Sequence, residues 1–343
     1  MSGGVDSSVA AALLKEKGYE VIGVSMRLLG FNEDKENGCC SLNDLNDARS
    51  VAYKLDIPYY VLNMEEVFSK EVISYFVEGY LKGETPNPCI RCNQTVKFKT
   101  LLKKAEGLGA ISLATGHYAR IVNNGAYRLL KGIDTEKDQS YFLFTMTQGE
   151  LSKTIFPLGG LTKKEVRKIA KGLGLKTAEK KESQEICFVT DGAYADIISN
   201  KIEMQEGPIV DLEGNCLGAH KGLFRYTIGQ RHGLGIGGPK GPYYVIDMDL
   251  SERKLIVGPE KELYSKTLIA RDLNWINGVT TGAITAKIRY KHPDETCEVR
   301  PLSDNKALVE FSNAQRAIAP GQAIVFYRGE EMLGGGWIEE KVR

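Results

Sequence analysis

Residues 2–8 read SGGVDSS, and a helix-like run follows at once over residues 9–17. Two adjacent glycines let a backbone pass close to a ligand, because neither carries a side chain. The start of the helix offers unpaired N–H groups and the positive end of a helix dipole. Serine hydroxyls in the same segment add further donors. The segment therefore predicts a binding site for an anion of the phosphate type.

This loop lacks the Gly-Lys-Ser/Thr ending of the Walker loop, so ordinary P-loop NTPase chemistry is a poor match. It resembles the pyrophosphatase loop, SGGxDS, of enzymes that split ATP into AMP and pyrophosphate. The alternative is that the segment only caps the helix, but the full heptapeptide is more specific than a helix cap requires.

The loop should follow a buried strand, whereas Met1 stands directly before the motif. We therefore expect the sheet to lack its first, central strand. Loss of a central strand exposes two strand edges. On that reasoning, a protein that begins at Met1 should be poorly soluble or weakly active.

Length, composition and charge restrict the class of protein to which the chain can belong. A chain of 343 residues that is 42% hydrophobic can form about two or three domains. Its net charge of +1 neither demands nor excludes nucleic acid. Neither an apolar stretch of about 20 residues nor a secretory signal is evident, so we expect a cytoplasmic protein without a membrane span. Its seven cysteines should then be reduced, and those that matter catalytic or metal-binding.

Helical and strand patterns alternate in the first part of the chain. Helices are predicted over 7–17, 43–55, 67–81, 97–108 and 162–173, and strands over 19–26, 59–63 and 110–115. The alternation favours an α/β domain with a parallel sheet that binds ligands at the carboxyl ends of its strands.

After about residue 205, glycine becomes frequent and short β-like runs are separated by turns. These runs cover 208–211, 243–247, 254–257, 284–290, 296–301, 307–311 and 323–327. We therefore predict an α/β catalytic domain over 1–205, a central β-rich domain over 206–265, and a C-terminal β domain over 266–343.

Segment 85–93, TPNPCIRCN, holds a Cys-x-x-Cys pair. Its two prolines stiffen the approach, and a helix start predicted at residue 97 would place Cys92 near a positive dipole end. Arg91 and Lys97 add positive charge that favours a thiolate. Structural zinc is the rival interpretation, but it needs two more ligands, and the chain has neither a second Cys-x-x-Cys nor a matching His pair.

Another cysteine, Cys187, lies in ESQEICF (182–188). Alone it would be read as a buried thiol. Beside a pyrophosphatase loop and the Cys-x-x-Cys segment it fits sulfur chemistry. ATP activates a carbonyl oxygen as an adenylate, and a sulfur nucleophile then displaces AMP. One thiol carries the sulfur, and a second releases it as a disulfide forms.

Ordered motifs over nearly the whole chain resemble those of the bacterial tRNA-specific 2-thiouridylases, which convert the wobble uridine of certain tRNAs to 2-thiouridine. They are SGGVDSS, CCSLNDLNDAR (39–49), TPNPCIRCN (85–93), ATGHYAR (114–120), KDQSYFL (137–143), ESQEICF (182–188), YTIGQRHGLGI (226–236), PGQ (320–322) and LGGGWI (333–338). The resemblance implies an adenine nucleotide alpha hydrolase-like (PP-loop) domain, followed by two small β-rich domains, the last a β-barrel.

The resemblance also implies roles for individual residues. ATP and Mg²⁺ would lie on the loop, with Asp6 near the metal. The residues that would bind ATP are Met1, Ser2, Gly3, Gly4, Val5, Asp6, Ser7, Ser8, Met26 and Gly116. Cys92 would be the nucleophile and Cys187 the persulfide carrier. The flipped target base would touch Asn87, Pro88 and Cys89. Contacts with tRNA would come from His117, Lys137, Asp138, Gln139, Arg289, Tyr290 and Gln322.

The implied partners are the anticodon loop of tRNA and a cysteine desulfurase or sulfur-relay protein that donates the persulfide. Some residues keep bland alternatives. His117 beside Tyr118 also fits a satisfied core histidine, and Arg289 a solvated strand face. Cysteines without evident chemistry are interpreted as packing: Cys39, Cys40, Cys216 and Cys297.

Cys89 departs from the family pattern, since many members carry Asp at this position. The change puts an acid or base role there in doubt. It also makes Cys89, Cys92 and Cys187 a hypothetical three-thiolate set for a 4Fe-4S cluster with one open iron.

The preferred function is an ATP-dependent tRNA sulfurtransferase. One alternative is a pyrophosphatase that adenylates a small metabolite, as amidotransferases and ligases do; pyrophosphate release that ignores tRNA would favour it. Another is a tRNA-binding protein without catalysis, which would bind tRNA but form no AMP.

Overall fold

The structure is a computed structural model that describes residues 1–29, 42–181, 186–188, 205–237 and 242–342. Cys39, Cys40 and the residues 182–185 of the ESQEICF motif lie outside this part. The chain divides into two compact units. Unit 1 comprises Met1–Ser74, Pro88–Gly192 and Gly329–Leu333, and unit 2 comprises Tyr75–Asn87, Ala193–Arg328 and Gly334–Arg343.

Unit 1 is the α/β part that the alternating pattern predicts. Its strands are β1 (Gly23–Arg27), β2 (Tyr59–Asn63), β3 (Leu113–Ala114), β4 (Ala119–Asn123), β5 (Tyr127–Lys131) and β6 (Thr154–Ile155). Strands β1 and β2 pair in parallel, and β3 pairs in parallel with β6. Within the described residues these form two separate two-stranded sheets. An antiparallel hairpin, β4–β5, was not expected from the sequence.

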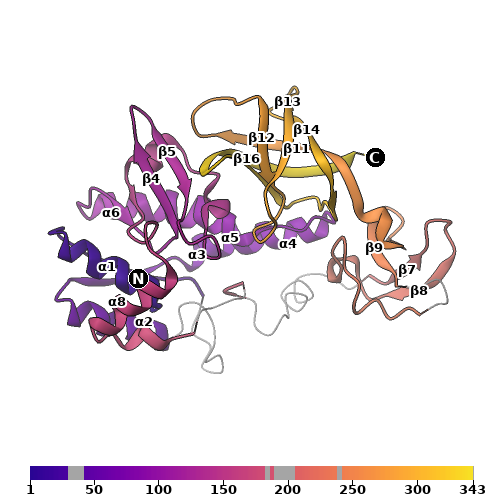
Figure 1. The fold of residues 1–343 in the computed structure, drawn as a ribbon. Coiled ribbons are helices and arrows are strands. Elements are labelled where there is room, and N and C mark those ends of the chain that lie inside the picture. Colours follow the sequence, from indigo (N-terminus) through magenta and orange to yellow (C-terminus); the bar gives the residue numbers. More distant parts are fainter. Residues whose placement is uncertain (30–41, 182–185, 189–204, 238–241, 343) are drawn as a thin grey trace. The chain divides into compact units, whose positions relative to one another are not determined.

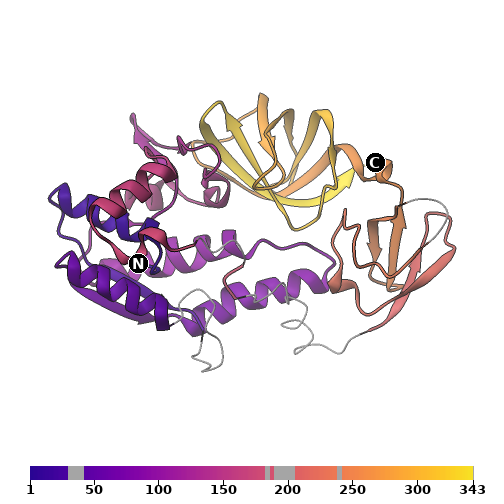
Figure 2. The same cartoon turned by 60° about the horizontal axis from the view of Figure 1, so that its bottom comes forward.

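Helix α1 packs its apolar face into the core of unit 1. It begins directly after the glycine pair, and Val5 and Val9 lie in one buried cluster with Val166 and Ala170 of α8. Both views show α1 and α8 side by side (Figures 1 and 2). The regular helices of this unit are α1 (Val5–Glu16), α2 (Leu42–Lys54), α3 (Glu65–Phe68), α5 (Pro88–Arg91), α6 (Leu102–Gly107), α7 (Gln148–Ser152) and α8 (Lys163–Gly172).

Two longer helical runs contain π-helical turns, which are rare in proteins and often occur at functional sites. The first runs through α3, η1 (Ser69–Ile73) and α4 (Ser74–Leu81). The second runs through α5, η2 (Cys92–Leu101) and α6. This second run begins at Pro88, not at residue 97 as predicted, because proline suits the first helical position, where no N–H donor is needed. Short 3₁₀ turns are η3 (Ser140–Leu143) and η4 (Lys176–Glu179).

The middle part of unit 2 is a four-stranded sheet in the order β8-β7-β10-β9. Its elements are β7 (Gly207–Val210), β8 (Cys216–His220), η5 (Leu223–Arg225), β9 (Tyr244–Asp249), β10 (Lys254–Gly258) and η6 (Glu260–Leu263). Ile209, Val245 and Leu255 are fully buried at its centre. The predicted central β-rich domain is confirmed.

Six strands of the described chain close into a barrel in the order β11-β14-β13-β12-β15-β16, and β11 pairs with β16 to complete the ring (Figure 1). Closure removes the unpaired strand edges that an open sheet would expose. The strands are β11 (Tyr264–Trp275), β12 (Gly282–Lys287), β13 (Glu295–Pro301), β14 (Ala307–Arg316), β15 (Ala323–Arg328) and β16 (Glu331–Val342). The predicted C-terminal β-barrel is therefore confirmed.

Among the described residues, the helices are too short or too polar to cross a membrane.

The barrel core yields a stability prediction. Leu268 of β11 is 0% exposed, and Leu268→Ala should lower the free energy of unfolding of the barrel by about 2–5 kcal/mol, because it leaves a cavity. Both tryptophans of the chain, Trp275 and Trp337, lie on β11 and β16, so their fluorescence in urea reports on this part. Leu302→Ala is the matched control: Leu302 is 47% exposed, and a change beyond about 0.5 kcal/mol there would contradict the assignment of the core.

Candidate active site

The loop at residues 2–8 has the geometry of an anion site. Helix α1 begins at Val5, and its N-cap Gly4 makes no side-chain cap hydrogen bond, so the first turn keeps donors for a ligand. The Ser7 and Ser8 hydroxyls both donate to the Gly4 carbonyl, over 3.2 and 2.8 Å. The Ser2 N–H donates to Ser7 Oγ over 3.1 Å. These bonds hold the loop closed around the start of the helix.

Glycine is required where this loop meets its neighbours. Gly3 has a φ of +69°, and a Cβ there would lie 2.3 Å from the Asp44 carbonyl oxygen. A Cβ on Gly116 would lie 2.9 Å from the Asp6 backbone and from the Ser7 nitrogen. Residues far apart in sequence therefore press directly on the loop. The structure thus brings Gly116 to the loop, and its role in binding ATP stays a prediction.

Met1 and Met26 belong to the neighbourhood of β1. The Met1 backbone is hydrogen-bonded to Val24 and Ser25, and Tyr59 donates to the Ser25 hydroxyl over 2.8 Å. Met26 lies on the same strand, in register with Leu62 of β2. A role for Met26 against adenosine stays a prediction.

Asp6 is the centre of a charged cluster that sequence reasoning missed. The Lys163 ammonium donates to both carboxylate oxygens over 2.8 and 2.7 Å, and the Tyr118 hydroxyl donates to Oδ1 over 2.8 Å. Lys163 is only 9% exposed. The Lys163 ammonium also lies 5.7 Å from the centroid of the Tyr118 ring. Nothing in the sequence around Lys163 signals this pairing, because its partner is 157 residues away.

The helix start fixes where Lys163 sits. Thr162 and Glu165 form a capping box at the first turn of α8. The Lys163 N–H donates to Asp134 Oδ2 over 2.8 Å. The backbone of Lys163 is therefore held independently of its ammonium group.

These donors fit Mg²⁺ only together with a nucleotide. Mg²⁺ in phosphate-transfer sites is commonly held by one or two carboxylates plus substrate phosphates. Asp6 supplies one such carboxylate, and a metal there would compete with the Lys163 ammonium. Over the described residues, no cluster of three or more His, Cys, Asp or Glu side chains that could hold a metal is found.

The candidate thiols lie in unit 1 but differ in exposure. Cys92, the first residue of η2, is 8% exposed, whereas Cys89 in α5 is exposed and Cys187 is half-buried. All three are present as thiols. The described chain does not gather them into a metal-ligand group, so the hypothetical 4Fe-4S cluster does not fit this arrangement.

One short stretch, residues 68–71, anchors both cysteine segments. Phe188, next to Cys187, packs edge-on against Phe68 with ring centroids 5.6 Å apart. Glu71 binds the Arg91 guanidinium at 2.8 Å and accepts a second Arg91 bond at its carbonyl over 3.1 Å. Arg91 is thus paired with a carboxylate, which offsets the positive charge expected to favour a thiolate at Cys92.

Asp138 and Gln139, two of the residues expected to contact tRNA, accept hydrogen bonds from the backbone of the protein itself. The Asp138 carboxylate is 6% exposed and accepts from the Gly132 N–H over 3.0 Å and from the Ser140 N–H over 3.1 Å. Gln139 Oε1 accepts from the Tyr118 N–H over 3.0 Å. Lys137 beside them is half-buried. Their contact with tRNA stays a prediction.

His117 has the surroundings of a core histidine. Its Nδ1 lies 2.7 Å from Thr115 Oγ1, and the rings of Phe98 and Phe156 pack on its imidazole with centroids 5.9 and 5.8 Å away. Burial, and then the charge of Lys97, lower the pKa of His117 well below its ordinary value. The imidazole is therefore neutral at pH 7, and a contact with tRNA would be a hydrogen bond rather than an ion pair.

Other expected contacts lie in unit 2. Arg289 donates through Nη2 to the carbonyls of Arg316 and Ala317. Tyr290 beside it is half-buried. Gln322 donates through Nε2 to the Thr85 carbonyl over 3.0 Å. Of the expected target-base segment, Asn87 falls in unit 2, and Pro88 and Cys89 fall in unit 1.

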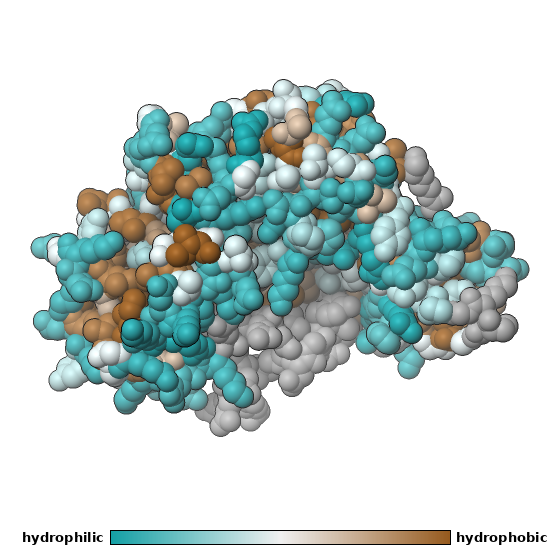
Figure 3. All heavy atoms as spheres, viewed as in Figure 1, coloured by the Kyte–Doolittle hydropathy of each residue, from teal (hydrophilic) through white to brown (hydrophobic). Residues whose placement is uncertain are grey.

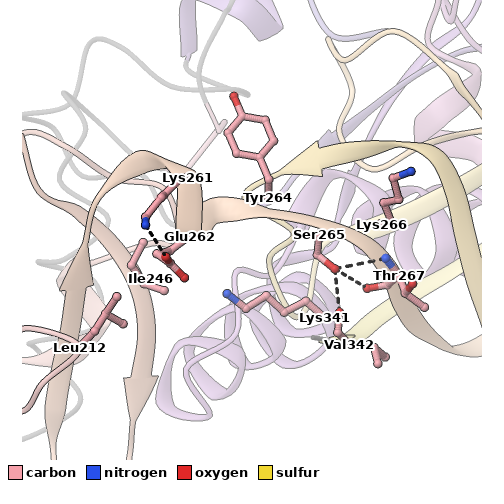
Figure 4. Close-up of a pocket in the computed structure, with 10 residues that line it drawn as sticks. All are labelled: Leu212, Ile246, Lys261, Glu262, Tyr264, Ser265, Lys266, Thr267, Lys341 and Val342. Carbon is pink, nitrogen blue, oxygen red and sulfur yellow. Dashed lines mark hydrogen bonds and ion pairs between the residues drawn. The ribbon is translucent and has the colours of Figure 1, made fainter.

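A hollow of about 420 Å³ in unit 2 offers charge but no redox chemistry. Figure 4 shows the Lys341 ammonium reaching into it, while Lys261 pairs with Glu262 and the Ser265 hydroxyl bonds to Thr267 and Val342. Its lining residues include no thiol. Its lining is Leu212, Ile246, Lys261, Glu262, Tyr264, Ser265, Lys266, Thr267, Lys341 and Val342.

On the face drawn in Figure 3, apolar atoms gather over the N-terminal part of the chain. Exposed apolar side chains of unit 1 include Tyr53, Tyr60 and Ile111.

Three family models match successive parts of the chain. Their descriptions are tRNA methyl transferase HUP domain for residues 1–191, tRNA methyl transferase PRC-barrel domain for residues 195–259, and aminomethyltransferase beta-barrel domain for residues 265–338.

Curated relatives match the whole chain. The tRNA-specific 2-thiouridylase MnmA of Geotalea uraniireducens is 55% identical, covering 100% of this chain and 94% of the relative. The enzyme of the same name from Geobacter metallireducens is 52% identical over 99% of this chain and 95% of its own length. That of Moorella thermoacetica is 52% identical over 99% of this chain and 98% of its own length.

The close approach at Gly116 yields a binding prediction. Gly116→Ala should weaken ATP binding by about tenfold or more, because the added methyl group displaces the loop at Asp6 and Ser7. Calorimetric titration with Mg-ATP measures the change. Gly107→Ala is the control, since a Cβ at Gly107 meets no atom within 4 Å. Unchanged affinity in the Gly116 variant would show that the loop does not bind the nucleotide.

His117 yields a pH prediction. Its pKa is lowered in the folded protein, so below about pH 6.5 the unfolded chain takes up a proton that the folded protein resists. Stability should therefore fall as the pH drops from 7 to 5, and His117→Gln should reduce this fall. Urea unfolding at each pH measures it, with His232→Gln, at an exposed position, as the control. An equal fall in wild type and His117→Gln would contradict the assignment.

Proposed function

The chain belongs to the family of tRNA-specific 2-thiouridylases, which are tRNA sulfurtransferases, and on that premise we propose that it uses ATP to place sulfur at C2 of the wobble uridine of tRNA. One observation carries the proposal. A pyrophosphatase loop at the start of α1 and two cysteine segments attached to residues 68–71 occur in the same compact unit. Activation by ATP and sulfur delivery need these two parts together.

In the first step, the C2 oxygen of the uridine attacks the α-phosphorus of ATP. The bond to the β-phosphate breaks, and pyrophosphate leaves with the negative charge. Loop N–H groups and the positive end of α1 stabilise that charge. Asp6 would hold Mg²⁺ together with the ATP phosphates, and the metal would neutralise charge on the leaving group. Lys163 adds a second positive charge beside Asp6.

In the second step, the terminal sulfur of a Cys187 persulfide bonds to C2, and AMP leaves with the original oxygen. The Cys92 thiolate then attacks the Cys187 sulfur, which breaks the persulfide bond and leaves the transferred sulfur on the base. The sulfur is reduced and the two cysteines are oxidised to a disulfide, so a dithiol reductant must restore them. In the other order, Cys92 first releases hydrosulfide, which attacks C2.

The target base would leave the stack of the anticodon loop and lie against Asn87, Pro88 and Cys89, where unstacking costs little. Remaining tRNA contacts would come from the residues assigned to them by the family resemblance. A cysteine desulfurase or a sulfur-relay protein would load Cys187. Since tRNA is the substrate, we expect the reaction to take place in the cytoplasm.

Cys92 must become accessible for either order of attack, because it is 8% exposed. It begins a π-helical segment, and such segments can change their hydrogen-bond register. Methyl transfer, the activity in the titles of two matching family models, would leave the ATP-splitting loop without a role. Adenylation of a small metabolite would leave the two cysteine segments without one.

The test is sulfur incorporation into unmodified tRNA that carries a wobble uridine, with Mg-ATP and a persulfide source. A mercury-containing gel retards thiolated tRNA. We expect a retarded band with the wild type and its loss in Cys187→Ser and Cys92→Ser, because each removes one sulfur partner.

Cys216→Ser is the matched control, since Cys216 is exposed and lies in unit 2. It should thiolate tRNA at the wild-type rate. Pyrophosphate release without tRNA would favour adenylation of a small metabolite. Binding of tRNA without AMP formation would favour a protein that binds tRNA and does not catalyse the reaction.

A further inference from the structure

Residues 84–85, shortly before the first cysteine helix, are bonded to the C-terminal barrel. Both backbone groups of Thr85 are bonded to the turn at residues 320–322. The Thr85 N–H donates to the Pro320 carbonyl over 2.7 Å, and the Thr85 carbonyl accepts from Gln322 Nε2 over 3.0 Å. This segment, which the sequence predicts to be part of the catalytic domain, therefore belongs to unit 2 together with the barrel.

A glycine permits this close contact. Gly321 has a φ of +82°, and a Cβ there would lie 2.7 Å from Glu84 Cβ and 3.0 Å from the Thr85 nitrogen. The turn is itself bound to β16, since the Gly321 N–H donates to the Ile338 carbonyl and the Ile338 N–H donates to the Gln322 carbonyl. Residues 84–85 therefore rest on a turn that the barrel holds.

An ion pair adds a side-chain contact. Arg271 Nη2 on β11 lies 2.7 Å from Glu84 Oε1, and the two side chains are 33% and 22% exposed. Such a half-exposed pair contributes modestly to stability, so its main effect is on the position of the loop.

The chain from Thr85 to Cys89 is stiff, because Pro86 and Pro88 fix their own φ angles and restrict the residues before them. Pro86 also packs on α4, where a Cβ at Gly79 would lie 2.9 Å from Pro86 Cγ. Asn87, expected to touch the target base, is thus held between two prolines and lies two residues after the bonded Thr85.

We propose that Arg271, Gly321 and Gln322 form a barrel clamp that positions Asn87 for thiolation, so that the C-terminal barrel takes part in placing the target base. This inference rests on the proposed function and adds positioning residues to it.

Substitutions of the ion pair test the clamp. Arg271→Met keeps an unbranched apolar stem and removes the charged guanidinium. It should lower kcat for thiolation by about tenfold to a hundredfold, since small misplacements of a reacting group cost rate. The KM for tRNA should change less than about twofold, because the clamp acts on position rather than on affinity.

Reversal of the pair separates positioning from other roles. Arg271→Glu should be slow, and Arg271→Glu combined with Glu84→Arg should recover most of kcat. Arg300→Met is the matched control. Arg300 pairs with Glu298 and Glu310 on the same barrel, and within the described part of the chain its ion pairs are with these carboxylates, so the kcat of this variant should equal that of the wild type.

A raised KM with unchanged kcat in Arg271→Met would overturn the proposal, since Arg271 would then bind tRNA directly. Failure of the reversed pair to recover kcat, while both variants melt at the wild-type temperature, would also overturn it. An unchanged kcat in Arg271→Met would also overturn the proposal.

Hydrogen exchange gives a readout independent of activity. The Glu84 and Thr85 amides donate to Gly79 and Pro320 in the structure, so they should be protected in the wild type and exchange faster in Arg271→Met. Unchanged exchange would overturn the clamp. If the wild type thiolates no tRNA, the proposed function fails, and the role given to the clamp fails with it even where exchange confirms the contact.

Discussion

The ion pair between Lys163 and Asp6 is the interaction on which the geometry of the candidate nucleotide site depends. It joins the pyrophosphatase loop to the start of α8, and Tyr118 completes it from a third segment. Lys163 is nearly enclosed, so removal of Asp6 would leave a buried charge unpaired. We expect this to lower the free energy of unfolding by more than the roughly 0–1 kcal/mol that an exposed ion pair contributes. The pair places a lysine ammonium directly beside the loop, next to the carboxylate that balances its charge.

The two cysteine segments depend on a different constraint, the packing of residues 68–71. Phe68 holds the chain beside Cys187, and Glu71 holds Arg91 beside Cys92. One helical stretch thereby anchors both cysteine segments. The barrel clamp adds a third constraint, on residues 84–85, just before the segment proposed to contact the base. The loop, the cysteine segments and residues 84–85 are thus held by separate contacts.

Element types were predictable where the sequence pattern is local. The strand predicted at 59–63 is β2, and the helix predicted at 162–173 is α8 with one residue fewer at each end. The strands that close the barrel, β11 and β16, were missed. Strand β16 contains three consecutive glycines, and Gly334 is needed there because a Cβ would lie 2.1 Å from the Asn274 carbonyl oxygen of β11. The need for glycine at this position is set by the neighbouring strand, so it leaves no alternating polar and apolar pattern in the sequence of β16.

The sequence by itself determined the phosphate loop, the cysteine segments and the order of domains, because glycine, serine and cysteine at short spacing carry their chemistry locally. Only the tertiary structure decided which charges meet. Lys163 pairs with Asp6, Arg91 with Glu71, and Arg271 with Glu84. A lysine or arginine looks alike on any helix or strand, and its partner is selected only when the fold brings distant segments within hydrogen-bonding distance.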